Sequence, residues 1–223
     1  MKDLEEFMKE KHIINLKINL ESLSKEQVAM YDTLNQIILY LDGTAYYTES
    51  FITHFDTVYS MVLPKEWMKW KIEKRVVEIT IKIKDYVSTG DGFFKLIAII
   101  VNLLENIISV VKKMKSVFGK HNIVTNYLQL YKTFAEIAVK NLSVLLYNAG
   151  GGKHFGEANE FVDKYIMKHY RLNNDPKDLL DAFIELVAIL ASLSKTAAER
   201  GWEILKEEVC KHGGVVEREK PIH

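Results

Sequence analysis

Histidine and acidic side chains recur at three-residue intervals directly after the most glycine-rich stretch of the chain. His154, Glu157, Glu160 and Asp163 fall at the start of a predicted helix, where residues three positions apart are neighbours. Helical di-metal proteins use Glu-x-x-His pairs on facing helices, and no Glu-x-x-His occurs in this sequence. Carboxylates in a first turn also complement the helix dipole. We therefore interpret these residues as a solvated helix start, and we expect no metal or other cofactor there.

The glycine-rich stretch, Gly150-Gly151-Gly152-Lys153, shares only some features of a phosphate-binding loop. Such a loop needs a preceding strand, four residues between its glycines, and Ser or Thr after the lysine. Here a helical pattern precedes the glycines, and His154 follows the lysine. The sequence therefore predicts a turn between two helices at 149–156.

The single cysteine, Cys210, lies close to Glu207, Glu208 and His212. Zinc sites use four ligands at recognised spacings, and this set is incomplete. One cysteine also excludes an internal disulfide, which fits a reducing compartment. We expect no metal here and a cytoplasmic location.

The densest basic run, Lys112, Lys113, Lys115 and Lys120, is the candidate contact surface for nucleic acid. It falls at the end of a predicted helix, where cations offset the dipole and cap free carbonyls. The whole chain carries 30 basic and 30 acidic residues and has a net charge of zero. Since nucleic-acid binding depends on neutralising phosphates, the composition supplies no evidence for it. The favoured interpretation of the run is a helix terminus.

Three tryptophans, Trp67, Trp70 and Trp202, are the candidate interface anchors, because Trp is enriched at the centres of protein interfaces. Trp67 and Trp70 stand among lysines and could also stack on bases. At helical spacing, core or interface positions are the favoured interpretation.

The chain has 223 residues, of which 48% are hydrophobic, so it can bury a substantial core. We predict one helical domain over 1–223, with its weakest seam at 149–156. The most apolar run, 93–111, contains Lys95, Asn102 and Glu105 and is therefore expected to be a buried helix and not a membrane span. No secretory signal is expected from the charged residues 1–11. Few prolines and many Ile, Lys and Glu residues suit a thermophile.

Apolar stripes with a helical period predict an all-α fold of six or seven helices, several of them long. Ser24 and Gln27 form a capping box that starts the first helix, and Asp42-Gly43 is expected to end it. Further helices are expected at 45–62, 65–87, 93–118, 122–148 and 157–170. One more helix, the last in the chain, is expected to begin at Asp175-Pro176, and Gly201 is expected to kink or split it. The tail, 215–223, is expected to fray.

Two segments, 14–20 and 77–84, alternate between apolar and polar residues as half-buried strands do. If both are strands, they can pair into a minor two-stranded ribbon. We favour a helix for 77–84, because no turn residue interrupts the surrounding pattern. For 14–20 both alternatives stay open.

The function we infer from these patterns is a non-enzymatic helical assembly or protein-interaction module that acts as an oligomer or complex subunit. The apolar run 93–111 and the aromatic residues outside it need more cover than we expect one small fold to provide. This predicts self-association or a protein partner, without a membrane. The first alternative is a nucleic-acid-associated accessory protein that uses the lysines of 112–120. The second is a small helical enzyme, which a deep pocket lined by converging His and Glu side chains would favour.

Overall fold

Six α-helices and a two-stranded ribbon make up the residues described by the computed structural model, namely 14–17, 23–62, 72–88, 90–119, 123–170 and 172–218. The helices are α2 (Lys25–Val62), α3 (Ile72–Tyr86), α4 (Gly92–Phe118), α5 (Ile123–Asn148), α6 (His154–Tyr165) and α7 (Pro176–Lys211). A short 3-10 helix, η3 (Met167–His169), follows α6. The predicted all-α bundle with a minor ribbon is confirmed.

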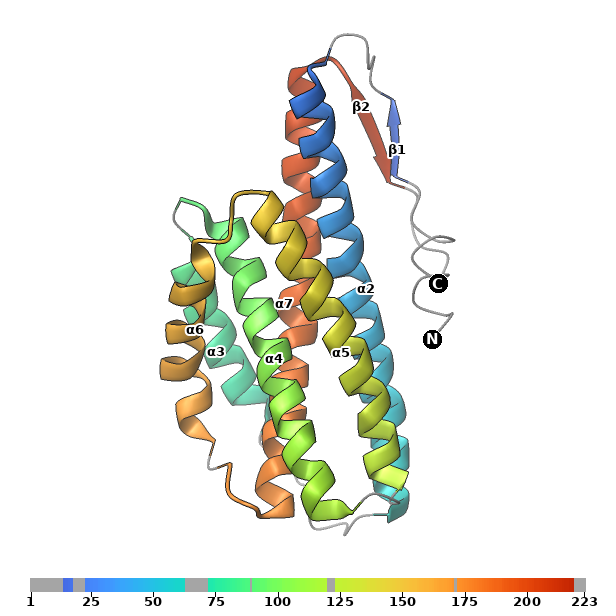
Figure 1. The fold of residues 1–223 in the computed structure, drawn as a ribbon, viewed down its shortest axis with the longest axis vertical. Helices are drawn as coiled ribbons and strands as arrows, with labels where there is room; N and C mark the ends of the chain where they lie inside the picture. Colours follow the sequence, from blue (N-terminus) through green and yellow to red (C-terminus); the bar gives the residue numbers. More distant parts are fainter. Residues whose placement is uncertain are drawn as a thin grey trace.

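The two longest helices come from opposite ends of the chain and pack along each other. α2 packs most extensively on α7, and both extend beyond the other helices at one end of the molecule (Figure 1). α2 starts with the predicted capping box, in which Gln27 N donates to Ser24 Oγ at 3.2 Å and Ser24 N donates to Gln27 Oε1 at 2.9 Å. Asp175 caps α7 by accepting hydrogen bonds from the backbone N–H groups of Lys177 and Asp178.

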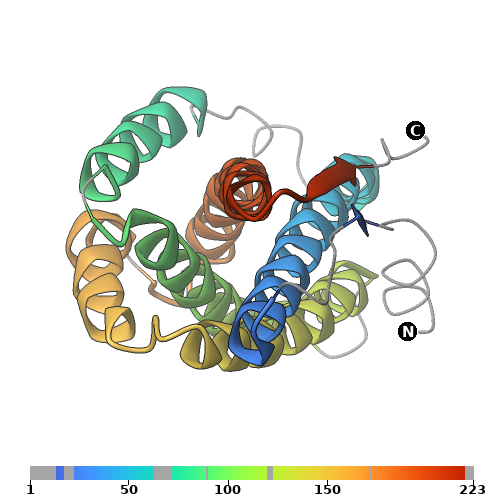
Figure 2. The same ribbon diagram turned by 90° about the horizontal axis from the view of Figure 1, so that it is seen from above.

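The most apolar helix, α4, is covered by the chain itself. It packs on α5, α6 and α7, and the view along the bundle shows α6 and α5 on either side of it (Figure 2). Within the described residues, α4 alone is long and apolar enough to cross a membrane, and 67% of its most apolar window is buried inside the bundle. α4 is therefore a helix that the rest of the chain buries on most sides, as expected for 93–111.

A cluster of aromatic rings fills the space between α2, α5 and α7. The rings of Phe51 and Tyr127 are stacked with their centroids 4.8 Å apart, and the ring of Tyr131 is tilted by 47° against Phe51 at 4.5 Å. The fully buried Tyr131 hydroxyl lies 3.0 Å from Thr48 Oγ1, so its polar atom has a partner. These contacts fix α5 against the long central pair.

The prediction that Asp42-Gly43 ends the first helix is wrong, because α2 continues through it to Val62. A glycine inside a helix costs about 1 kcal/mol relative to alanine. The apolar stripe continues across it, with Leu41, Ala45 and Phe51 all buried, and this packing outweighs the local preference. Likewise, Gly201 does not split α7, which is one helix from Pro176 to Lys211.

The segment 77–84 is helical, as favoured, and forms part of α3. Its apolar residues divide between two faces, as a helix requires: Ile79 and Ile83 are buried, whereas Val77 and Ile81 are more than half exposed. In a strand, all four would have shared one face.

The ribbon exists, but its second strand comes from the end of the chain. β1 (Ile14–Lys17) pairs antiparallel with β2 (Val215–Arg218), with Ile14 opposite Arg218. The prediction of a frayed tail is therefore wrong for 215–218, where backbone pairing and the burial of Val216 hold the chain. Residues 219–223 lie outside the described residues.

Candidate functional site

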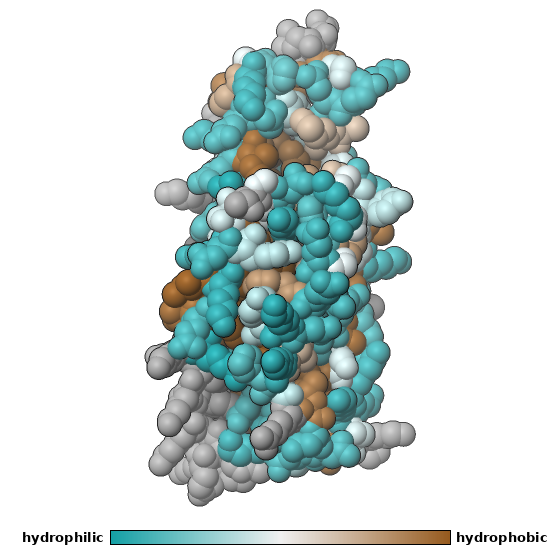
Figure 3. Space-filling view, turned by 90° about the vertical axis from the view of Figure 1, so that its left-hand side faces the viewer, coloured by the Kyte–Doolittle hydropathy of each residue, from teal (hydrophilic) through white to brown (hydrophobic). Residues whose placement is uncertain are grey.

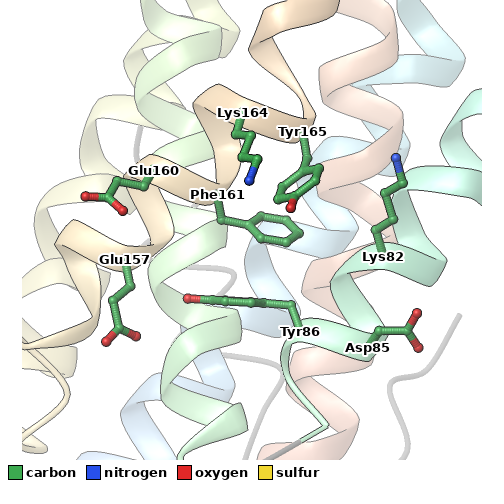
Figure 4. Close-up of a pocket in the computed structure, with 8 residues that line it drawn as sticks. All are labelled: Lys82, Asp85, Tyr86, Glu157, Glu160, Phe161, Lys164 and Tyr165. Atoms are coloured by element: carbon green, nitrogen blue, oxygen red, sulfur yellow. The ribbon is translucent and has the colours of Figure 1, made fainter.

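A cleft of about 570 Å³ opens between α3 and α6. Its lining residues are Lys82, Asp85 and Tyr86 from α3, and Glu157, Glu160, Phe161, Lys164 and Tyr165 from α6 (Figure 4). The side of the molecule formed by these two helices is mostly hydrophilic, with separate small hydrophobic patches (Figure 3). The two helices present the cleft because Ile83 of α3 and Val162 of α6 are fully buried and hold them to the bundle.

Three aromatic rings form one wall of this cleft. The ring centroids of Tyr86 and Phe161 are 4.5 Å apart with an interplanar angle of 29°, and those of Phe161 and Tyr165 are 4.9 Å apart. Phe161 is buried, while Tyr86 and Tyr165 are partly exposed. Phe161 thus contacts both other rings, and Lys95 Nζ lies 5.2 Å from the centroid of the Tyr86 ring, so these rings are held mainly by contacts within the protein.

Lysine side chains lie at one end of the aromatic wall. Lys82 Nζ is 5.6 Å and Lys164 Nζ is 5.1 Å from the centroid of the Tyr165 ring, at distances typical of cation–π contacts. Figure 4 shows Tyr165 between the two lysines. Neither ammonium group has a carboxylate within ion-pair distance among the described residues.

Acidic side chains lie at the other end, where the Tyr86 hydroxyl points toward the side of the cleft that holds Glu157 (Figure 4). Burial raises the pKa of the Tyr86 hydroxyl, and the negative charge of Glu157 raises it further. Behind Glu157 lies the buried His154, whose Nδ1 is 3.5 Å from Glu157 Oε2 and whose Nε2 is 3.3 Å from Asp91 Oδ2.

Asp91 links this group to the start of α4. Lys153 Nζ lies 2.7 Å from Asp91 Oδ2, and this hydrogen bond is the main cause that lowers the pKa of the Asp91 carboxyl. Lys153, predicted to be part of a loop, thus ties the start of α6 to the start of α4. The helix begins at His154, three residues earlier than expected, so its first turn includes this histidine.

The structure separates the four regularly spaced residues of the sequence. His154 is buried, Glu157 and Glu160 line the cleft, and Asp163 is exposed and outside the lining. In the part of the chain that the structure describes, no three His, Cys, Asp or Glu side chains are grouped as a metal site would require. Sequence reasoning missed Lys82, Tyr86 and Tyr165, since only the packing of α3 on α6 brings them together.

The lysine run is divided among different surroundings. Lys112 is exposed, Lys113 Nζ donates to the Leu172 carbonyl at 3.3 Å, and Lys115 Nζ donates to Gln129 Oε1 at 3.3 Å. Lys120 lies outside the described residues. Two of the four candidate contacts therefore help to hold neighbouring segments.

Of the candidate interface anchors, Trp67 and Trp70 lie outside the described residues. Trp202 is partly buried on α7 and packs against the core. Cys210 is exposed at the end of α7, and His212 Nε2 lies 3.1 Å from Gln27 Nε2, so the histidine contacts the start of α2.

A charged pair, in which Glu185 is buried and Arg75 is partly exposed, joins α3 to α7. Arg75 Nε lies 2.8 Å from Glu185 Oε1, and the Arg75 guanidinium lies 4.8 Å from the centroid of the Tyr170 ring. Burial raises the pKa of the Glu185 carboxyl, an effect that the positive charge of Arg75 partly offsets. Neither Arg75 nor Glu185 lines the cleft between α3 and α6. We therefore interpret the pair as a packing contact.

The outer face of α5 carries a row of apolar residues spaced seven apart: Ile123, Leu130, Ile137 and Val144. Ile123, Leu130 and Val144 are 56%, 59% and 53% exposed, and Ile137 is partly exposed. Tyr147, one turn beyond Val144, is 74% exposed. Of the ten exposed large apolar residues among those described, four belong to α5, more than to any other helix.

Comparison with known protein families, with curated proteins and with solved structures finds no match to this chain. The candidate sites therefore stand on their geometry alone.

Proposed function

We propose that this protein is a non-enzymatic helical assembly module that self-associates through the outer face of α5. The observation that carries the proposal is the exposed row Ile123, Leu130, Ile137 and Val144. Apolar residues at seven-residue intervals fall on nearly the same face of a helix, since two turns take about 7.2 residues. The row spans the 22 residues 123–144, or roughly 32 Å of helix.

The row suits a second copy of the same chain, because it is symmetric about its middle. A two-fold axis between Thr133 and Phe134 places Ile123 opposite Val144 of the second copy. The same axis places Leu130 opposite Ile137, so each apolar side chain meets an apolar side chain. Because the net charge of the chain is zero, two copies do not repel each other through their overall charge.

The experiment compares the mass in solution of the wild-type chain with that of Leu130→Glu, by light scattering at tens of micromolar protein. We expect a wild-type dimer and a Leu130→Glu monomer. Residue 130 is more than half exposed in the free chain, so the variant folds, but dimerisation would bury its charge. An unpaired buried charge costs about 3–5 kcal/mol, which weakens dimerisation roughly a hundredfold or more.

Val77→Glu is the matched control, since Val77 is 56% exposed but lies on α3. It adds the same charge at a similarly exposed position, and we expect it to remain a dimer. A wild-type monomer at these concentrations, or equal dissociation by both variants, would rule out self-association through α5.

A further inference from the structure

We propose that His154 is a pH-sensitive switch: on gaining a proton, it draws the Glu157 carboxylate away from Tyr86 and loosens α3 beside the cleft. His154 and Glu157 belong to the first turn of α6, and Tyr86 is the last residue of α3. The imidazole of His154 is buried, Glu157 is mostly exposed, and Tyr86 is partly exposed. None of the three belongs to α5, so the proposal does not rest on self-association.

One nitrogen of the imidazole, Nε2, carries a proton in both charge states of His154. It lies 3.3 Å from Asp91 Oδ2, at the start of α4. A hydrogen bond from Lys153 and the charge of this lysine lower the pKa of the Asp91 carboxyl, so Asp91 is ionised and can only accept. The Nε2–H group therefore donates to Asp91.

The other nitrogen, Nδ1, then has no proton in the neutral imidazole. It is buried and makes no hydrogen bond within the part of the chain that the structure describes. Its lone pair faces Glu157 Oε2 at 3.5 Å, so two acceptors meet without a proton between them. A proton on Nδ1 replaces this mismatch with a charge-assisted hydrogen bond, and Asp91 and Glu157 together offset the charge of the buried imidazolium.

Glu157 also interacts with Tyr86 across the cleft. Burial raises the pKa of the Tyr86 hydroxyl most, the charge of Glu157 and a hydrogen bond to its carboxylate raise it further, and the charge of Glu160 adds to this. Figure 4 shows the hydroxyl pointing toward the side of the cleft that holds Glu157. The imidazolium carries a full positive charge that the phenol lacks, so a protonated His154 is the stronger partner of Glu157.

Tyr86 links the last turn of α3 to its neighbours. Its ring stacks on Phe161 of α6 at 4.5 Å, and Lys95 Nζ of α4 lies 5.2 Å from the ring centroid. These ring contacts remain when Glu157 turns to His154, but the hydroxyl loses its bond to the carboxylate. We therefore expect the last turn of α3 to open more often at low pH and the cleft to widen.

The test is hydrogen exchange of the backbone amides of α3 in the full chain at pH 8 and pH 5.5. An ordinary histidine side chain changes charge between these values, whereas ordinary carboxylates stay ionised. Protection factors correct for the effect of pH on the exchange chemistry itself. We expect the protection of α3 to fall about tenfold more in the wild type than in His154→Gln, the factor that one hydrogen bond to a charged group implies.

The comparison with His154→Gln isolates the switch. A glutamine does not titrate, but its amide can still donate to Asp91. Because both proteins are measured at the same two pH values, the titration of Glu185 and other groups cancels.

Two further variants test the other members of the group. Glu157→Gln removes the charge that the imidazolium attracts, and the Glu157 side chain is 60% exposed, so the variant retains the fold. Tyr86→Phe keeps the stacked ring and removes the hydroxyl. Both should show the small pH response of His154→Gln, and Tyr86→Phe should already have at pH 8 the low protection that the wild type reaches at pH 5.5.

His169→Gln is the matched control, since His169 is exposed in η3 and its loss should leave the pH response unchanged. The proposal is overturned if His154→Gln responds to pH as the wild type does. It is also overturned if Glu157→Gln or Tyr86→Phe keeps the full wild-type response. If His154→Gln does not fold, these two variants decide the question by the same criterion.

Discussion

Gly201 of α7 faces the ring of Phe93 at the start of α4. A Cβ atom at position 201 would lie 2.9 Å from Phe93 Cζ and 2.9 Å from Ile38 Cγ1 of α2. Three helices therefore meet where α7 has no side chain. The conformational freedom that glycine offers is not needed at this point; its small volume is.

Replacing Gly201 by alanine is expected to lower the free energy of unfolding by about 1 kcal/mol, because overpacking outweighs the gain in helix propensity. Gly156→Ala in α6 is the matched control, since nothing lies within 4 Å of a Cβ placed there. That variant should gain about 1 kcal/mol from propensity alone. Urea denaturation of both variants measures these changes. An equal gain in the free energy of unfolding for both variants would show that a methyl group fits between α7, α4 and α2 at position 201.

Glu185 is expected to make stability fall as pH rises. Burial raises the pKa of this carboxyl in the folded protein above its unfolded value, so its contribution is complete at low pH. That contribution is lost as pH rises through the folded pKa, where a buried group must ionise. The free energy of unfolding of the wild type should therefore decline relative to Glu185→Gln by about 1 kcal/mol between pH 4 and 7.

Arg75→Met tests the cause of this decline. Arg75 is the positive charge that faces Glu185, whereas Asp181 adds a negative one. Without the guanidinium, the pKa of Glu185 should rise further and the decline should extend to higher pH. Denaturation of all three proteins at the same pH values cancels the contribution of other titrating groups. If the free energies of unfolding of the wild type and Glu185→Gln changed with pH in parallel, Glu185 would not be the cause of the decline.

Nucleic-acid binding through the lysine run is expected to be weak and sensitive to salt. Lys113 and Lys115 already donate to Leu172 and Gln129, and the net charge of the chain is zero. Fluorescence anisotropy with a DNA duplex at 50 and 150 mM salt should show no tight binding at the higher concentration.

The lysine variant for this measurement is the triple change of Lys112, Lys113 and Lys115 to Glu. The same change at the exposed Lys25, Lys195 and Lys206 is the charge-matched control. Tight wild-type binding at 150 mM salt that only the first triple variant abolishes would establish the nucleic-acid alternative in place of assembly.

Local signals in the sequence predicted the features that local physics decides. Ser24 with Gln27, and Asp175 before Pro176, satisfy backbone N–H groups within one turn, so their effect does not depend on the rest of the chain. The same holds for the end of α4, where Gly119 adopts a φ of 81° that favours glycine. These helix boundaries were therefore predictable.

Features that depend on residues far away in the sequence could not be predicted. Gly43 lies within α2 because the stripe on both sides of it is buried, and this burial comes from helices later in the chain. The partner of β1 is β2, some 200 residues away, and no local pattern in Val215–Arg218 marks it. The cleft could not be predicted for the same reason, since Lys82 and Lys164 are ordinary surface lysines until α3 packs beside α6.

The pairing of the first and last elements has a consequence for synthesis. β1 and α2 emerge from the ribosome before α3, α4, α5 and α6, whereas their partners β2 and α7 are made after these helices. At about 5 to 20 residues per second, β1 waits roughly 10 to 40 seconds for its partner strand. During that interval α2 exposes the apolar stripe that α7 will cover, so the nascent chain needs protection that the finished protein does not.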